Sequence, residues 1–374
     1  MALRDDIDPN GYDEFSVVFT DRSLNHMSAT FQQVMRDISD NLKSVYGASA
    51  VALVPGGGTF AMEAVARQFA QNANCLVVRN GWFSFRWSQI FEAGGFTGSE
   101  TVMKARRTGN DAQSPFAPAP IEEVTARIRA EKPDLVIAPH VETSSGIILP
   151  DAYVTAMAAA AHKVGALMVL DCIASGCVWV DMAATGVDVL ISAPQKGWSS
   201  TPCAGLVMLS DRAMARMEAS TSNSFAADLK KWHQIMLAYE NGGHAYHATL
   251  PTDGLRAFRD TMLESRDIGF EHLAAAQWDL GTKVRALLAS HGIPSVAAPG
   301  FEAPGVVVSY TANPEIQSGR AFAAEGTQIA AGVPLQCDEG DGFSTFRLGL
   351  FGLDKLADVD ATVERLQKTL NKVV

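Results

Sequence analysis

The sequence predicts an α/β fold, in which a large and mostly parallel β-sheet is covered by helices on both faces and is followed by a smaller α+β domain. Up to about residue 210, short apolar runs that look like buried strands alternate with segments of helical periodicity. Fully buried strands form continuous apolar runs, so this alternation is typical of a parallel sheet between two layers of helices. Beyond about residue 290 the pattern changes to shorter mixed segments and a closing helix over 356–373.

The elements of the large sheet can be assigned in order along the chain. Residues 28–46 predict a helix because apolar side chains recur every three or four positions, with Ser28 able to cap it and Gly47 able to end it. The segments that follow are strand 50–55, a helix opened by the turn "GGGT", strand 75–80, helix 121–130, strand 134–140, helix 151–163, and strands 166–171, 187–192 and 204–209.

A long helical stretch that begins near Leu255 separates the two parts of the chain. We therefore expect residues 1–24 to form an N-terminal arm and residues 25–255 to form the large domain. Residues 256–374 are expected to form the small C-terminal domain, which begins with the linking helix.

Composition and charge exclude several classes of function. The 374 residues carry a formal net charge of −11 at pH 7, which argues against nucleic acid or an anionic membrane as the main partner. There is no apolar run of about 18 residues and no apolar segment typical of a signal peptide, so we expect a cytoplasmic protein. Five scattered cysteines fit reduced thiols, and the eight histidines lack metal-ligand spacing, so no metal site is predicted.

Three polar features lie where predicted strands end, and chemistry in such sheets gathers at the carboxyl ends of the strands. The turn "PGGGT" at residues 55–59 opens a helix, and its backbone amides can attract an anion. Asp171 ends an apolar strand, where a carboxylate needs a cation or a hydrogen-bond donor. Lys196 lies in "SAPQKGWS", a stretch with no other charge, and such surroundings make an amine easier to deprotonate.

Taken alone, the turn and Asp171 each have an ordinary structural explanation, as a strand-to-helix connection and a helix cap. Together with a desolvated lysine, however, they match what pyridoxal 5′-phosphate requires. Its aldehyde forms a Schiff base with a lysine, its ring nitrogen needs an acid to stay protonated, and its phosphate needs an anion cradle. The sequence therefore predicts a pyridoxal phosphate enzyme in which Lys196 and Asp171 are the catalytic residues.

From about residue 25 to its end, the chain resembles the class V aminotransferases of fold type I, in the alanine–glyoxylate, serine–pyruvate and 2-aminoethylphosphonate transaminase group. The resemblance rests on seven stretches in a specific order: "GGGTFAMEA", "NGWFSFRW", "HVETSSGI", "LDCIASG", "SAPQKG", "AYHAT" and "FRLGLFG". It implies that the cofactor phosphate contacts Gly57, Gly58, Thr59 and Gln195. It also implies that Phe83 and Ile173 cover opposite faces of the ring, that Asp171 holds the ring nitrogen, and that Thr143 or Ser144 contacts the phenolic oxygen.

The same resemblance implies how the substrate and a second subunit take part. Arg347 is expected to bind the carboxylate or phosphonate of the substrate. Tyr246 and Thr249 are expected to reach the phosphate of the other subunit's cofactor, which implies a homodimer with shared sites. The implied reaction is ping-pong transfer of an amino group from a small donor, of the alanine or serine type, to a small 2-oxo acid such as glyoxylate or pyruvate, with Lys196 also acting as the general base.

Three other functions are compatible with this type of site: a 2-aminoethylphosphonate-type transaminase, a pyridoxal phosphate-dependent lyase or desulfurase on the same fold, and a catalytically silent cofactor-binding protein. Desulfurases of this group carry a histidine directly before the lysine and a mobile catalytic cysteine. Here Gln195 precedes Lys196, and Cys337 lies in an acidic loop. The intact set of lysine, Asp171 and Arg347 argues against a silent protein.

One region departs from the family pattern at the substrate pocket. Relatives usually begin with a Gly-Pro-rich segment that lines this pocket, whereas the chain has "DEFSVVFTDRSLNH" there. Tyr46, Arg86 and Trp198 are further candidates for contact with the substrate.

Overall fold

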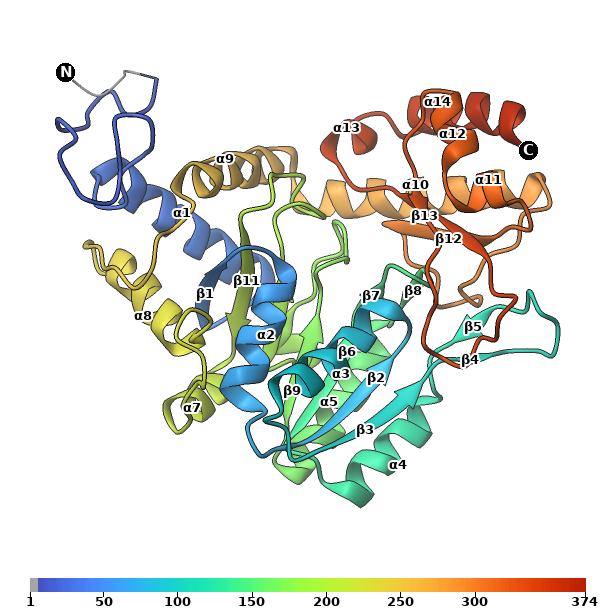
Figure 1. Ribbon diagram of the computed structural model, residues 1–374, viewed down its shortest axis with the longest axis horizontal. Coiled ribbons are helices and arrows are strands. Elements are labelled where there is room, and N and C mark those ends of the chain that lie inside the picture. Colours follow the sequence, from blue (N-terminus) through green and yellow to red (C-terminus); the bar gives the residue numbers. More distant parts are fainter. Residues whose placement is uncertain (1–5) are drawn as a thin grey trace.

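The computed structural model describes residues 6–374, and its centre is a seven-stranded sheet (Figure 1). Across the sheet the strands occur in the order β1, β11, β10, β9, β6, β2 and β3. Five of them, from β10 to β3, pair in parallel, whereas β11 is antiparallel to both of its neighbours. Their bounds are β1 (Ala50–Pro55), β2 (Asn74–Arg79), β3 (Ser99–Lys104), β6 (Leu135–Pro139), β9 (Leu167–Asp171), β10 (Val189–Ser192) and β11 (Ala204–Leu209).

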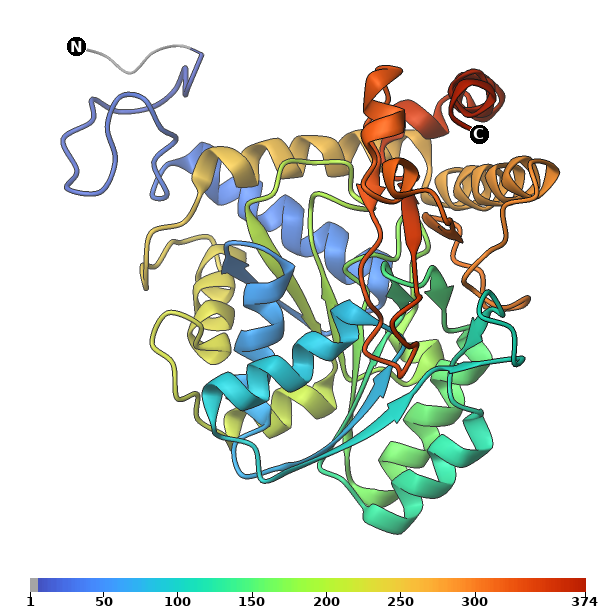
Figure 2. The ribbon, with the colours of Figure 1, turned by 45° about the vertical axis from the view of Figure 1, so that its right-hand side comes forward.

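Helices cover both faces of this sheet, as the continuous burial of its central strands requires. Helices α2 and α3 lie on one face and α4 and α5 on the other (Figures 1 and 2). The helices packed around this sheet are α1 (Ala29–Tyr46), α2 (Gly58–Phe69), α3 (Trp82–Gly94), α4 (Ile121–Glu131), α5 (Asp151–Val164), α6 (Met182–Thr185), α7 (Asp211–Glu218), α8 (Leu229–Glu240) and α9 (Thr252–Ile268).

The first helix shows how the sequence sets the ends of an element. The Ser28 side chain accepts a hydrogen bond from the backbone amide of Phe31, and Gly47 ends the helix in the left-handed region at φ 63°. Between these ends, Phe31, Ile38 and Leu42 are fully buried. The helix predicted over 28–46 is therefore confirmed.

A second, smaller α+β unit follows, with an antiparallel sheet in the order β12, β14, β13. It is built from α10 (Phe270–Ser290), β12 (Val306–Tyr310), α11 (Pro314–Gln317), α12 (Arg320–Ala324), β13 (Ala330–Ala331), β14 (Thr345–Gly349), α13 (Leu353–Leu356) and α14 (Val359–Val373). Two short ribbons, β4 (Arg106–Arg107) with β5 (Phe116–Ala117) and β7 (Val141–Glu142) with β8 (Ile147–Ile148), complete the strands. The predicted α/β fold, with its smaller α+β part, is confirmed.

The helical stretch predicted from Leu255 consists of two helices, α9 and α10, which are separated at Gly269 (φ 103°). Phe258 and Met262 of α9 pack into the core of the large sheet, whereas Leu280 of α10 belongs to the core of the smaller unit. The division of the chain into an arm and two domains stays a prediction.

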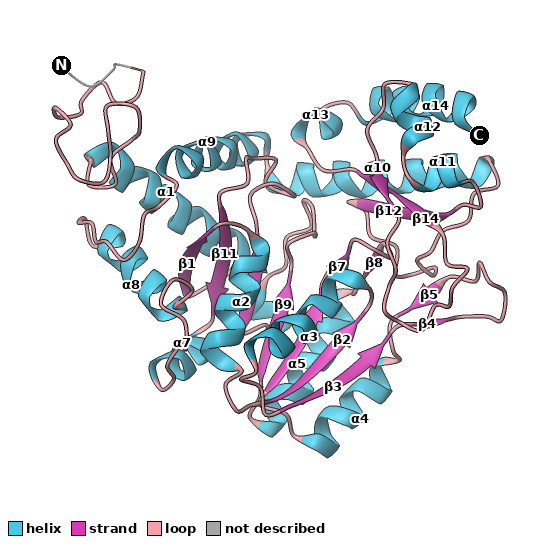
Figure 3. Cartoon of the chain, in the orientation of Figure 1, coloured by secondary structure: helices cyan, strands magenta, loops and turns pink. Residues whose placement is uncertain are grey.

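Residues 6–28 contain no helix or strand, and Figure 3 draws them as loop. The rest of the predicted arm, residues 1–5, lies outside the described residues. None of the helices in the described part of the chain is long and apolar enough to cross a membrane.

Candidate active site

Most of the predicted site residues line one cavity of about 230 Å³ at the carboxyl ends of the parallel strands. Asp171 is the last residue of β9, Lys196 follows β10, and Gly58 begins α2. Asp171 and Lys196 lie together because β9 and β10 are adjacent, and Gly58 reaches the same edge because β1 runs in the same direction as β10, with β11 between them. The cavity is lined by Gly58, Thr59, Met62, Phe83, Arg86, Val141, Thr143, Asp171, Ile173, Ala174, Gln195 and Lys196.

Lys196 is a half-buried amine in a partly apolar setting. Its Nζ lies 5.3 Å from the centre of the Phe351 ring. Burial lowers the pKa of Lys196, the charge of Arg347 lowers it further, and the charge of Asp171 partly offsets both. A larger fraction of the amine is therefore neutral near pH 7 than for an exposed lysine, as a nucleophile or general base requires.

Asp171 is a buried carboxyl group, 7% exposed, with one close donor. Burial raises the pKa of Asp171 to about 7, and the charge of Glu142 contributes in the same direction. The Ile173 amide donates to Asp171 Oδ1 at 3.0 Å and, with the charges of Arg86 and Lys196, opposes the rise. Such an acid is available to bind a cationic ring nitrogen, which would restore its ionised form.

Two glycines are needed for this geometry. A Cβ at Gly58 would collide with the side chain of Ile173, and a Cβ at Gly197 would collide with the backbone carbonyl of Gly176. Because Gly58 has no side chain, α2 can begin directly against Ile173 at the cavity. Because Gly197 has none, the turn that carries Lys196 can approach the loop that contains Gly176.

The start of α3, which presents Phe83 to the cavity, is tied to the loop after β6 by Glu142. The Glu142 side chain is fully buried and accepts hydrogen bonds from the amides of Phe83 (3.2 Å) and Ser84 (2.8 Å). It also accepts from both the amide and the hydroxyl of Ser144. The Ser144 hydroxyl in turn accepts from the Trp82 amide at 2.8 Å.

The two adjacent hydroxyl residues predicted for the phenolic oxygen thus have different surroundings. Thr143 lines the cavity, whereas Ser144 is used to fix the start of α3 and does not line it. Which of them contacts a cofactor stays a prediction.

Four further predicted residues lie outside the lining of this cavity. Gly57 is the N-cap of α2. Tyr246 is 55% exposed, and its hydroxyl lies 3.2 Å from that of Thr249. Arg347, on β14, lies beside the cavity: its guanidinium is 5.7 Å from the centre of the Phe83 ring, and its Nε donates to the carbonyl of Ala331 at 2.8 Å. Burial lowers the pKa of Arg347, and the charge of Glu142 opposes this.

Two residues have prominent places in the structure that the sequence does not predict: Glu142, which has no predicted role, and Arg86, which is predicted only as a candidate for contact with the substrate. Glu142 holds α3, as described above. Arg86 lines the cavity and donates from Nη1 to the Thr59 hydroxyl at 2.7 Å. A signal for Arg86 was available, because it follows Phe83 by three positions and such residues share a helix face. The segment had not been predicted as a helix.

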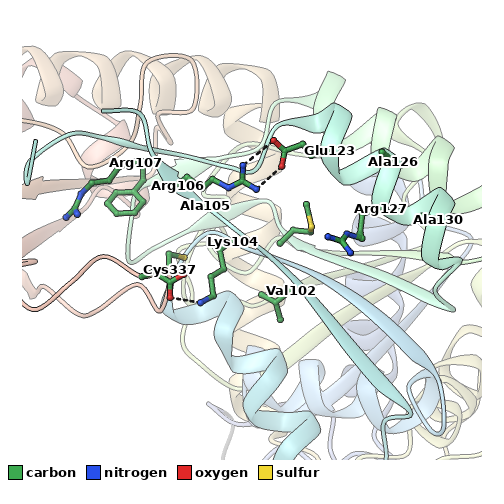
Figure 4. Close-up of a pocket in the computed structure, with 13 residues that line it drawn as sticks. Val102, Lys104, Ala105, Arg106, Arg107, Glu123, Ala126, Arg127, Ala130 and Cys337 are labelled. Atoms are coloured by element: carbon green, nitrogen blue, oxygen red, sulfur yellow. Dashed lines mark hydrogen bonds and ion pairs between the residues drawn. The ribbon is translucent and has the colours of Figure 1, made fainter. Parts of the chain in front are cut away.

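A larger groove of about 900 Å³ lies along β3, β4 and α4 and is shown in Figure 4. It contains none of the predicted site residues. Two of its cations are already paired, Arg106 with Glu123 and Lys104 with Asp338, each at 2.7 Å (Figure 4). The smaller cavity, not this groove, therefore holds the candidate chemistry. No cluster of three or more His, Cys, Asp or Glu side chains suited to a metal ion occurs within residues 6–374.

The groups that line the cavity fit pyridoxal phosphate. Phe83 and Ile173 provide apolar walls, while Asp171 and Lys196 provide an acid and an amine. The side-chain oxygen of Gln195 is buried without a hydrogen-bond partner among the described residues, so no contact fixes this end of the amide, and a turn of the carboxamide would present its NH2 group to an anion. Fold and site together define the class of a fold type I pyridoxal phosphate enzyme.

Comparison with known proteins identifies the family. The family model described as aminotransferase class-V matches residues 12–310. The chain is 26% identical to a soluble hydrogenase small subunit of Synechococcus sp. (strain PCC 6716), over 93% of this chain and 87% of that protein. It is 26% identical to alanine–glyoxylate aminotransferase 1 of Saccharomyces cerevisiae, over 69% of this chain and 67% of the relative.

A solved structure supports the same conclusion for the fold. The alanine–glyoxylate aminotransferase of Nostoc sp. superposes with a TM-score of 0.77 at 20% identity, covering 92% of this chain and 88% of that one. The chain belongs to the class V aminotransferase family, whose pyridoxal phosphate-dependent transaminases it matches in fold and sequence. The predicted cofactor and reaction class are thereby confirmed.

Proposed function

We propose that this transaminase moves the amino group of a small amino acid, of the alanine or serine type, to a small 2-oxo acid such as glyoxylate or pyruvate. The observation that carries the assignment of roles is the pairing of Lys196, whose pKa is lowered, with the buried acid Asp171 in one cavity. The relative in Saccharomyces cerevisiae carries the name of an alanine–glyoxylate enzyme, which supports small substrates. We also propose that the protein works in the cytoplasm.

Bound pyridoxal phosphate supplies an aldehyde and a protonated ring that withdraws electrons from the substrate. The amine of Lys196 would hold this aldehyde. The same amine, whose pKa is lowered by burial, would serve as the general base for the proton on the donor's Cα. The Asp171 carboxylate pairs with the ring nitrogen and keeps its proton in place.

The remaining residues bind and orient. Phe83 and Ile173 hold the two faces of the ring and exclude water. Thr143 contacts the phenolic oxygen, which its place in the cavity lining supports. Gly57, Gly58, Thr59 and Gln195 hold the phosphate, and the amides of Gly58 and Thr59 suit an anion because the first two amides of a helix lack partners within it. Arg347 binds the substrate carboxylate with its planar fork.

The working unit in this proposal is a homodimer in which Tyr246 and Thr249 complete the partner's phosphate site. Their hydroxyls are exposed in the single chain, and Phe60, which directly follows Thr59, is 57% exposed. An exposed aromatic side chain in the first turn of α2 suits a protein–protein contact. The two shared residues would then add donors to a phosphate held mainly by the first subunit.

The lyase or desulfurase alternative is not favoured by the surroundings of the cysteine on which it depends. Cys337 is buried, and its thiol donates to the carbonyl of Arg79 at 3.4 Å. Burial raises the pKa of Cys337 to about 12, and the charges of Glu142 and Glu339 contribute. Such a thiol is inert near neutral pH, whereas a desulfurase needs a thiolate.

A half-reaction assay tests the proposal. The purified holoprotein is mixed with L-alanine, L-serine, 2-aminoethylphosphonate or L-cysteine, with no acceptor. The absorbance of the cofactor and the released product are measured. We expect pyruvate from alanine in a single stoichiometric turnover, followed by continuous turnover when glyoxylate is added. Release of sulfide from cysteine without any oxo acid from the other donors would contradict the proposal.

A further inference from the structure

Arg86 is a cation in the wall of the cofactor cavity that forms no ion pair within residues 6–374, although its charge acts on the nearby Asp171. Of the side chains that line this cavity, only those of Lys196 and Arg86 are basic. The one hydrogen bond of the Arg86 guanidinium to the described residues goes from Nη1 to the neutral hydroxyl of Thr59 at 2.7 Å. Its other donors are neither used nor buried, so they are available to a ligand.

The position of Arg86 directs these donors toward the start of α2. Thr59 is the second residue of this helix, where backbone amides have no partner within the helix. Because the Thr59 hydroxyl accepts its hydrogen bond from Arg86, its own proton is free for an anionic acceptor. Guanidinium, hydroxyl and amides therefore converge on one place.

The Arg86 side chain is held in this orientation by contacts within the protein itself. Its guanidinium lies 5.1 Å from the centre of the Phe83 ring, three positions earlier on the same helix. The start of that helix is fixed in turn by hydrogen bonds to the buried Glu142. A preorganised donor loses little conformational freedom on binding.

We propose that Arg86 binds the phosphate of pyridoxal phosphate as the charged member of a cradle whose other members are neutral. This inference rests on the proposed function. The phosphate carries nearly two negative charges, whereas the backbone amides of α2 and the side chains of Thr59 and Gln195 are neutral and contribute only dipoles. Lys196, the other cation of the cavity, is assigned to the aldehyde of the cofactor. A guanidinium offers two parallel charge-assisted hydrogen bonds to such a group, which a lysine does not.

The rival role for Arg86 is binding of a substrate anion, and Arg347 provides the contrast. Arg347 comes from β14 of the smaller unit and lies close enough to Lys196 for its charge to lower the pKa of the amine. Arg86 instead is hydrogen-bonded to the start of α2. Both guanidinium groups lie near the Phe83 ring, but only Arg86 is hydrogen-bonded to the first turn of α2, whose residues are the ones proposed for the phosphate.

The test compares two ligands that differ only in the phosphate. Cofactor-free protein, prepared from the holoprotein, is titrated with pyridoxal phosphate and with pyridoxal, and dissociation constants are measured by tryptophan fluorescence. The wild type, Arg86→Gln, Arg86→Lys and the matched control Arg347→Gln are compared. We expect Arg86→Gln to weaken binding of pyridoxal phosphate roughly 10- to 100-fold and to change that of pyridoxal less than about twofold. For Arg86→Lys we expect a dissociation constant for pyridoxal phosphate between those of the wild type and Arg86→Gln. Arg347→Gln should keep the wild-type ratio of the two dissociation constants.

Two results would overturn the inference while leaving the proposed function intact. Equal weakening of both ligands by Arg86→Gln would mean that Arg86 only supports the cavity. An unchanged preference for pyridoxal phosphate, with a raised KM for the amino donor, would assign Arg86 to the substrate. A wild type that binds pyridoxal as tightly as pyridoxal phosphate would instead contradict the proposed function itself.

Discussion

Lys196 and Asp171 show how burial alone prepares side chains for chemistry. Both groups are held close enough for their charges to interact, yet burial is the largest influence on each. Burial lowers the pKa of the amine and raises that of the acid, so the neutral form of each group is more populated than it would be in water. A cationic ring nitrogen beside Asp171 would lower the pKa of this carboxyl group again and favour its ionised form.

Because the pKa of Asp171 is raised in the folded protein, we expect the free energy of unfolding of the cofactor-free protein to fall as the pH rises. A folded pKa of about 7, above the ordinary 3.8, means that the folded state binds this proton more tightly than the unfolded state. The stability that Asp171 contributes is thus present below about pH 4 and is lost as the pH rises to 7. Asp171→Asn lacks this loss. Urea unfolding at pH 5 and pH 8 should show the variant gaining about 1–3 kcal/mol relative to the wild type at the higher pH. An equal difference at both values would contradict the raised pKa.

Arg347 makes a prediction about substrate recognition. Arg347→Lys keeps the charge but loses the planar fork that binds a carboxylate through two hydrogen bonds. We expect kcat/KM for carboxylate donors to fall roughly 10- to 100-fold, equivalent to about 1.4–2.8 kcal/mol. Steady-state kinetics with alanine check this. A value within twofold of the wild type would remove Arg347 from the site.

At the scale of elements, the turn after β10 places Lys196 only because residue 197 has no side chain. Gly197→Ala would drive a Cβ into the backbone carbonyl of Gly176, which cannot move aside cheaply. We expect a loss of about 1–3 kcal/mol of unfolding free energy, together with weaker cofactor binding. The control is Gly342→Ala, at an exposed glycine where a Cβ meets nothing within 4 Å. Thermal unfolding that shifts equally in both variants would contradict the close approach.

Which elements the sequence could predict depended on how completely they are buried. Strands such as β6 and β9 are buried along their whole length and carry a continuous apolar run, so the sequence predicts them almost to the residue. The edge strand β3 was missed because most of its residues are not buried and no apolar run marks it. Helix α3 was missed because its aromatic residues face both the cavity and the core, which hides the helical period.

The local sequence pattern likewise predicts only part of the candidate site. Lys196 and Asp171 can be recognised because each is a charged residue at the end of an apolar strand. The choice between Thr143 and Ser144 could not be made from sequence, since it depends on a hydrogen bond across 62 positions between Ser144 and Trp82. The part played by Glu142 likewise depends on contacts with α3 that no local pattern records.

For the whole molecule, the proposed shared site predicts complementation between two inactive variants. Lys196→Ala and the double variant Tyr246→Phe, Thr249→Ala are mixed under conditions of subunit exchange. In a hybrid dimer, the subunit with the intact lysine receives intact hydroxyls from the other chain, so one complete site forms. We expect about half of the wild-type activity per hybrid dimer. Exchange verified by native mass spectrometry without any recovered activity would contradict the shared arrangement.

Reductive labelling tests most directly whether the cavity around Lys196 is the pyridoxal phosphate site of a transaminase. The yellow holoprotein is treated with borohydride, digested, and examined by peptide mass spectrometry, with and without prior addition of L-alanine. Without alanine, we expect a cofactor label on Lys196 and on no other lysine. With alanine, we expect the label to be lost as pyruvate appears. A label on a different lysine, or one on Lys196 that alanine does not remove while pyruvate forms, would contradict this assignment.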